Sequence, residues 1–215
     1  MSTHLWVLSA ALAVAAVLTW VATVRGDGAL ARIVRPSFAL LVLAAAWSLE
    51  GEGRAGDAPP LTLVLPALAL AVVTEGLLLH QTRPRFVLAM YARAVTTGLL
   101  VAATLRLAGP GSFPWWVLPV VPVLLLVHAR AGRTVVLRAG PERVAVLLAL
   151  LAQYVLVVAA AWRADPLVLA GACLLLVADL VLTRDRYVRE RRAAPLQALA
   201  LHQLASVAVV VGLMR

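Results

Sequence analysis

The 215-residue sequence carries too few polar side chains to coat a water-soluble protein. Hydrophobic residues make up 63% of it, charged residues make up only 13%, and the mean hydropathy is +0.97. An average soluble domain has about 45–50% apolar and about 25% charged residues, so the composition excludes a soluble fold. It predicts a single integral membrane domain over residues 1–215. Cys173 is the sole cysteine, which excludes a disulfide framework and a cysteine-based metal site.

Eight apolar runs follow one another along the chain, and a bilayer-crossing helix needs about 20 residues. In order, they are Leu5–Val24, Ser37–Leu49 with an extension back through Ile33, Leu61–Leu79, Phe86–Leu105, Phe113–Val127, Val144–Trp162, Leu167–Leu182 and Leu196–Met214. The second and fifth runs are short, which leaves seven spans as the alternative. We therefore predict an all-α, polytopic membrane bundle of about eight transmembrane helices.

The arginines fall unevenly on the connections between these runs. Fourteen lie on every second connection, namely Arg25, Arg32, Arg35, Arg83, Arg85, Arg130, Arg133, Arg138, Arg143, Arg184, Arg186, Arg189, Arg191 and Arg192. Basic residues in short loops stay cytoplasmic, so both termini are predicted to face away from the cytoplasm. The net charge of +9 then lies against anionic lipid headgroups, and we expect membrane lipids, not nucleic acid, as partners.

Three ionisable residues interrupt the apolar runs themselves. Glu75, Arg93 and Asp179 would each cost at least about 2.5–3.5 kcal/mol in hydrocarbon unless they face a polar interior. With a rise of 1.5 Å per residue, Glu75 and Asp179 lie roughly 5 Å inside the cytoplasmic boundary of their spans, and Arg93 lies about two turns in from the same side. The three residues are therefore predicted to lie at nearly the same depth.

Further polar residues fall at a similar depth on other spans. Arg35 stands at the inner end of the second span, Thr97 follows Arg93 on the fourth, and His202 and Gln203 lie on the last. Together they predict one polar layer in the inner leaflet. The simpler interpretation is structural, with Glu75 or Asp179 paired with Arg93 to hold helices together.

A weak internal repeat places the two acids in equivalent positions. Val72-Val-Thr-Glu75 is followed downstream by Arg85-Phe86-Val87, and Leu176-Val-Ala-Asp179 is followed by Arg186-Tyr187-Val188. Both segments run in the same direction across the membrane. The pattern indicates two parallel four-helix repeats related by an axis along the membrane normal.

The segment from Gly171 to Tyr187 resembles the G-A-x-L-F-x-x-S-D-x-x-L-A-x-x-x-F pattern of the YhhN-type lysoplasmalogenases. Arg35-Pro36 is similar to the family's Lys-Pro, and the Glu75 and Arg85-Phe86 segments are similar to its G-D-x-L-L and R-F. The resemblance implies an eight-helix, cofactor-free enzyme of the bacterial plasma membrane. Such an enzyme hydrolyses the vinyl-ether bond of lysoplasmalogens, a class of lysophospholipid, and gives a fatty aldehyde and a glycerophospho-headgroup.

That chemistry suits the predicted polar layer. Vinyl-ether hydrolysis needs a proton delivered to carbon, a cation stabilised and a water activated, a task similar to that of paired carboxylates in glycosidases. We predict Glu75 and Asp179 as the catalytic pair, without assigning which is the donor. The predicted substrate-binding residues are Arg35, Arg93, Thr97, His202 and Gln203, of which the two arginines suit a phosphate. Two alternatives stay open: an inactive lipid- or partner-binding relative, and a small proton-coupled transporter.

Overall fold

The computed structural model describes residues 3–51, 61–79, 82–108 and 115–214. Throughout these ranges the regular structure is helical, without a strand. The elements are α1 (Thr3–Arg25), α2 (Gly28–Gly51), α3 (Leu61–Leu78), α4 (Arg83–Ala108), the 3₁₀ turn η1 (Trp115–Val117), α5 (Val120–Val127), the π turn η2 (His128–Gly132), α6 (Arg133–Arg138), the 3₁₀ turn η3 (Gly140–Glu142), α7 (Arg143–Arg163), α8 (Pro166–Tyr187) and α9 (Ala194–Leu213). The predicted all-α membrane bundle is confirmed.

Seven of the described helices are long and apolar enough to cross a membrane, and α3 adds a shorter apolar helix, Thr62–Leu78. The fifth of the predicted spans is longer than expected. Its predicted start at Phe113 lies outside the described residues, and its helix continues past Val127 through η2 and α6 to Arg138. Val135 is buried in this extension, so the last turns pack against the bundle although arginines flank them.

Local sequence sets two of the other helix starts. The carboxylate of Asp27 accepts hydrogen bonds from the backbone N–H groups of Ala29 and Leu30, both at 3.0 Å, so α2 begins well before the predicted Ile33. Asp165 caps α8 in the same way, and Pro166 follows at the first helical position, where its missing N–H is not needed.

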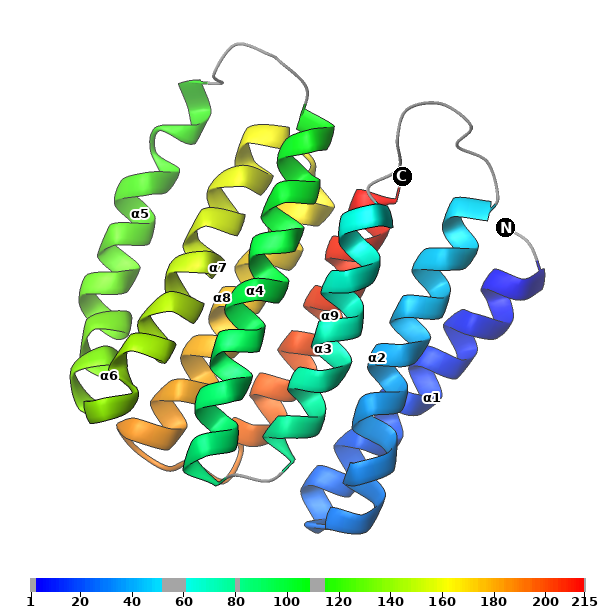
Figure 1. The fold of residues 1–215 in the computed structure, drawn as a ribbon, viewed down its shortest axis with the longest axis horizontal. Coiled ribbons are helices and arrows are strands. Elements are labelled where there is room, and N and C mark those ends of the chain that lie inside the picture. The colour runs from blue at the N-terminus through cyan, green and yellow to red at the C-terminus, as the bar shows by residue number, and fades with distance from the viewer. Residues whose placement is uncertain (1–2, 52–60, 80–81, 109–114, 215) are drawn as a thin grey trace.

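Most consecutive helices lie side by side and run antiparallel, although α7 rather than α5 packs against α4, and Thr3 and Met214 lie at the same end of the bundle (Figure 1). The arginine-rich connections lie at the other end. Which end faces the cytoplasm remains a prediction from the arginine distribution.

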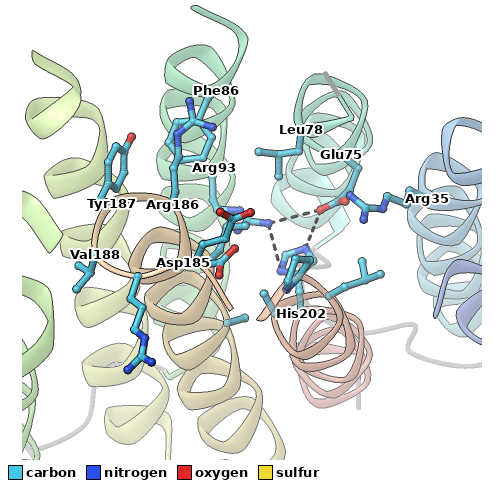
Figure 2. Close-up of a pocket in the computed structure, with 17 residues that line it drawn as sticks. Arg35, Glu75, Leu78, Phe86, Arg93, Asp185, Arg186, Tyr187, Val188 and His202 are labelled. Atoms are coloured by element: carbon cyan, nitrogen blue, oxygen red, sulfur yellow. Dashed lines mark hydrogen bonds and ion pairs between the residues drawn. The ribbon is translucent and has the colours of Figure 1, made fainter. Parts of the chain in front are cut away.

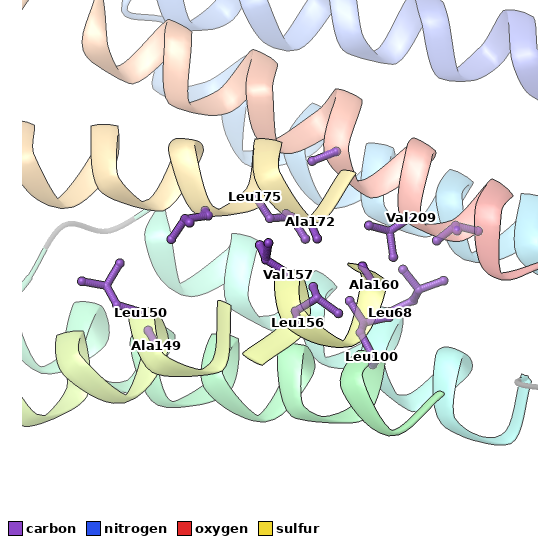
Figure 3. Close-up of a cluster of buried hydrophobic side chains, with 14 of the residues drawn as sticks. Leu68, Leu100, Ala149, Leu150, Leu156, Val157, Ala160, Ala172, Leu175 and Val209 are labelled. Carbon is purple, nitrogen blue, oxygen red and sulfur yellow. The ribbon is translucent and has the colours of Figure 1, made fainter. Parts of the chain in front are cut away.

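Helices α4, α7, α8 and α9 form the centre of the bundle, where Ala, Val and Leu side chains interlock (Figure 3). Small residues bring α8 and α9 close together. A Cβ atom added to Gly171 would lie 2.6 Å from Val209 Cγ2 and 2.9 Å from the Val209 backbone nitrogen. Close backbone approach of this kind replaces the hydrophobic effect as the main source of helix association in lipid.

The two halves of the chain do not pack equivalently. Helix α4 lies against α7 along much of its length, whereas the corresponding pair, α9 and α2, makes few contacts. The four-helix repeat therefore stays a prediction from the sequence.

Candidate functional site

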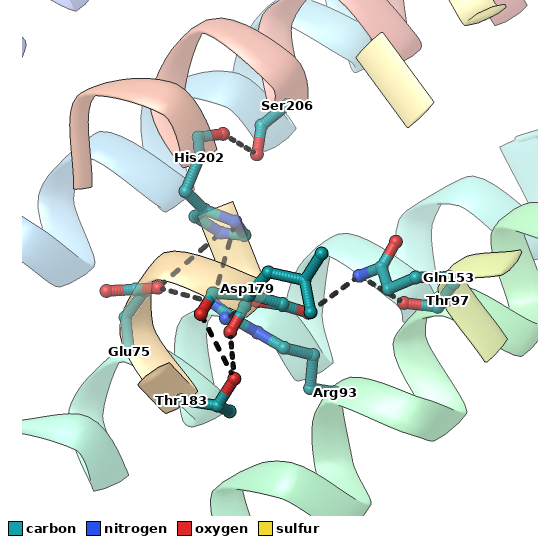
Figure 4. A network of polar contacts seen from close by, with 9 residues as sticks. Glu75, Arg93, Thr97, Gln153, Asp179, Thr183, His202 and Ser206 are labelled. Atoms are coloured by element: carbon teal, nitrogen blue, oxygen red, sulfur yellow. Dashed lines mark hydrogen bonds and ion pairs between the residues drawn. The ribbon is translucent and has the colours of Figure 1, made fainter. Parts of the chain in front are cut away.

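The guanidinium group of Arg93 lies at the centre of a buried polar network (Figure 4). Its Nη1 donates a hydrogen bond to Oδ1 of Asp179, and its Nη2 lies 3.5 Å from Oε1 of Glu75. Both acids are buried, Glu75 with 7% of its surface exposed and Asp179 with 1%. Because one guanidinium group contacts both carboxylates, Arg93 of α4 links helices α3 and α8 at one depth.

The second carboxylate oxygen of Asp179 also has a partner. Gln153 of α7 donates from Nε2 to Asp179 Oδ2 at 3.0 Å, and the same nitrogen lies 3.3 Å from Thr97 Oγ1. Asp179 therefore accepts hydrogen bonds from two helices, α4 and α7. One turn later, Thr183 donates to the backbone carbonyl of Asp179 at 2.6 Å.

His202 joins the network from α9. Its Nδ1 lies 3.5 Å from Arg93 Nη2, and its Nε2 lies 3.5 Å from Glu75 Oε1. A guanidinium group can only donate hydrogen bonds, so Nδ1 accepts and the proton of the neutral ring is on Nε2, facing Glu75. The imidazole ring thus bridges Arg93 and Glu75.

A cavity of about 400 Å³ opens beside this network and extends to the turn after α8 (Figure 2). Glu75, Arg93 and His202 line its inner end, and Arg35 lines one wall. Asp179 is not among the lining residues of this cavity, whereas its partner Arg93 is. Of the two predicted catalytic acids, Glu75 is the one that reaches this space.

The other wall of the cavity is formed by side chains near the ends of α4 and α8. The guanidinium of Arg186 stacks over the Phe86 ring at 4.0 Å, and the Tyr187 hydroxyl donates to Glu142. Arg83 also pairs with Glu142, with Nε 3.0 Å from Oε1. These contacts bring Phe86 and Tyr187, the aromatic residues of the two repeat segments, against each other with ring centroids 6.0 Å apart.

Two of the predicted substrate-binding residues lie away from the large cavity. Thr97 faces Gln153 and lines a separate cavity of about 40 Å³. Gln203 accepts a hydrogen bond from the Trp20 indole nitrogen at 2.7 Å and lines a third cavity, of about 30 Å³, that Arg35 also lines.

Sequence reasoning missed Gln153, although a glutamine within an apolar run could have been found by the same depth argument. Trp20 and Glu142 carried no such signal, because tryptophan is common at membrane interfaces and Glu142 lies in a connection. Among the described residues, no three His, Cys, Asp or Glu side chains converge closely enough to hold a metal ion.

Comparison with known proteins gives one match. The model of the YhhN family matches residues 30–213, from the first turn of α2 to the end of α9. No curated protein and no solved structure matches the chain. The matched region contains every residue of the buried network and of the large cavity. The chain is therefore a multi-pass membrane protein that belongs to the YhhN family.

Proposed function

We propose that this protein hydrolyses the vinyl-ether bond of lysoplasmalogen-like lysophospholipids in the bacterial plasma membrane. The observation that carries the proposal is the buried Arg93 network with a carboxylate and an imidazole facing one cavity of about 400 Å³. Ligand cavities commonly measure about 300–1,000 Å³. The resemblance to lysoplasmalogenases supports the same conclusion.

Charge balance supports an exchangeable proton at Glu75. With both acids ionised and His202 neutral, the network would carry one positive and two negative charges, leaving one negative charge uncompensated inside the membrane. An unpaired buried charge is strongly unfavourable, and one added proton makes the network neutral. Within the network, Glu75 and His202 are the two groups that both line the cavity and can exchange a proton. The added proton is therefore within reach of a substrate in the cavity.

The reaction then proceeds in two steps at Glu75. The protonated carboxyl group transfers its proton to the vinyl carbon remote from the ether oxygen, and the adjacent carbon becomes an oxocarbenium ion beside the new carboxylate. The carboxylate stabilises this cation and accepts a proton from the attacking water. The resulting hemiacetal separates into a fatty aldehyde and the free hydroxyl of the glycerophospho-headgroup. His202, whose Nε2 lies 3.5 Å from Glu75 Oε1, orients the carboxyl group during both transfers.

Asp179 is assigned a positioning role, because it acts through Arg93. Its carboxylate, held by Gln153, fixes the guanidinium and offsets its charge, so that the remaining proton belongs to Glu75. Thr97 supports Gln153 in this arrangement.

Arg35 is proposed to hold the substrate phosphate. It lines the large cavity, and among the described residues its buried Nε has no hydrogen-bond partner, while Nη2 contacts Thr23 Oγ1 at 3.3 Å. A buried donor without a partner is rare and is satisfied readily by a charged oxygen. Arg186 and Arg189 line the same cavity nearer its mouth and add positive charge.

The test is aldehyde release by the purified protein supplied with lysoplasmalogens of different headgroups. Glu75→Gln keeps the shape of the side chain but cannot transfer a proton, so we expect at least about 100-fold slower turnover. Asp165→Asn is the matched control, because it also changes an acid to an amide but keeps a capping group far from the cavity. Unchanged turnover in Glu75→Gln would disprove the mechanism. No aldehyde from the wild-type protein with any lysoplasmalogen would disprove the activity.

A proton-coupled transporter is the second candidate, and one observation favours it. Arg93 and His202 line both the large cavity and the 40 Å³ cavity, which extends along α4 and α9 toward the opposite membrane face. A path of this kind predicts proton flux into proteoliposomes that depends on His202. Flux that is lost in His202→Phe, together with no aldehyde release, would favour transport over hydrolysis.

A further inference from the structure

A second groove lies near the arginine-rich end of the bundle, on the far side of α8 from most of the large cavity. It has a volume of about 160 Å³ and is bounded by three helices, α6, α8 and α9. Its lining residues are Ala131, Val135, Val177, Leu180, Val181, Arg184, Asp185, Arg189, Arg191, Ala194 and Gln197. The groove is thus apolar along its length and cationic at one end.

The sequence of α8 accounts for the apolar length and the cationic end of the groove. Val177, Val181 and Arg184 follow one another at spacings of four and three residues, so they share one face of the helix. Val177 is 44% exposed, as expected for a side chain that faces lipid. At 1.5 Å per residue, Arg184 stands roughly 10 Å along the helix axis from Val177, at the inner end of the apolar stripe.

The cationic end has an excess of unpaired positive charge. Arg184, Arg189 and Arg191 are exposed, and within the described ranges their guanidinium groups make no hydrogen bond or salt bridge. The one acid of the groove, Asp185, accepts a hydrogen bond from the backbone N–H of Arg191 at 2.6 Å. Three arginines therefore surround one end of the groove against a single carboxylate.

We propose that this groove binds an anionic phospholipid, with the phosphate held by Arg184 and Arg191 and an acyl chain along Val177 and Val181. Charge complementarity selects the headgroup, because three arginines and one acid leave a net positive charge that a zwitterionic headgroup does not balance. The apolar stripe of a membrane-spanning helix selects a lipid over a soluble anion. The groove lies next to the large cavity, but this proposal does not depend on the hydrolase activity.

The groove and the large cavity share part of one wall. Asp185 and Arg189 line both spaces, at the end of α8 and in the turn that follows. A lipid phosphate that draws Arg189 toward the groove would remove a positive charge from the mouth of the cavity.

The test is native mass spectrometry of the full-length protein, purified in detergent and titrated with phosphatidylglycerol or phosphatidylcholine. We expect the wild type to retain phosphatidylglycerol at least about tenfold more tightly than phosphatidylcholine. Arg184→Ala/Arg191→Ala should weaken phosphatidylglycerol binding about 30-fold, given the usual contribution of an arginine at a lipid surface. The matched control is Arg130→Ala/Arg133→Ala, which removes the same charge from the same end of the molecule but not from the groove.

A second variant tests the apolar part of the groove without changing its charge. Val181→Phe places a larger side chain in the acyl-chain position and should also weaken phosphatidylglycerol binding. Three results would overturn the proposal: no preference for phosphatidylglycerol in the wild type, an equal loss in the two double-arginine variants, or unchanged binding in Val181→Phe. An equal loss would mean that the arginines act only as a diffuse surface charge.

Discussion

Removal of the Arg93 side-chain charge should destabilise the bundle more than any other single arginine substitution. Arg93 is 5% exposed, and its guanidinium contacts Asp179, Glu75 and His202. Arg93→Met keeps the length of the side chain but leaves the Asp179 carboxylate without its counter-charge and Glu75 without its guanidinium contact. Loss of one partner of a buried ion pair costs about 3–5 kcal/mol.

The loss can be measured as a shift in the melting temperature of the purified protein in detergent. For a chain of about 200 residues, 1 kcal/mol corresponds to roughly 2–4 °C, so Arg93→Met should lower Tm by about 6–20 °C. Arg106→Met is the control, because Arg106 is an exposed arginine in the last turn of the same helix. Its substitution should change stability by no more than about 0.5 kcal/mol.

A double variant separates charge from packing. Asp179→Leu in the Arg93→Met background removes the carboxylate that has lost its counter-charge, so the double variant should be more stable than Arg93→Met alone. If the two substitutions are instead simply additive, the guanidinium and the carboxylate do not stabilise each other. The ion-pair explanation of the network would then be refuted, even if Arg93→Met lowers Tm.

Three further predictions concern topology and packing. Reporter fusions at the two termini should both report a non-cytoplasmic location, and a cytoplasmic C-terminus would reverse the orientation taken from the arginines. Gly171→Ala should destabilise the α8–α9 contact. Gly98→Ala, with no atom within 4 Å of the added Cβ, should instead be neutral or stabilising by up to about 1 kcal/mol. Equal Tm values for these two variants would contradict the prediction. Trp20→Phe should cost about 1–3 kcal/mol by leaving Gln203 Oε1 without its donor, and Trp20→Phe/Gln203→Leu should recover part of that loss.

The depth of the polar network could be predicted from the sequence because helix geometry fixes it. Glu75 and Asp179 stand three or four residues before the ends of parallel predicted spans, and Arg93 stands about two turns into an antiparallel one. A constant rise per residue then places all three at nearly the same depth, whatever the tertiary arrangement. The structure also brings the three side chains into direct contact, which the depth argument alone does not predict.

The direction in which each side chain points could not be predicted in the same way. Most of these helices are apolar on every face, because lipid and bundle interior are both nonpolar, so the usual amphipathic pattern is absent. Gln203 illustrates the problem, since it follows His202 directly yet faces Trp20 of α1. Adjacent residues on a helix lie about 100° apart, and depth alone does not distinguish them.

Because side-chain direction could not be predicted, the sequence also could not show that Glu75 and Asp179 have different surroundings. Asp179 has Arg93 on one carboxylate oxygen and Gln153 on the other, so its hydrogen-bonding capacity is directed into the protein. Among the described residues, Glu75 has polar contacts at 3.5 Å with Arg93 and with His202, and it borders the cavity. A tightly bonded carboxylate is suited to holding a cation in place, whereas a loosely held one at a cavity surface is free to exchange a proton. The different contacts of the two acids, on which their proposed roles rest, therefore come from the helices that surround each acid, and not from the depth at which it lies.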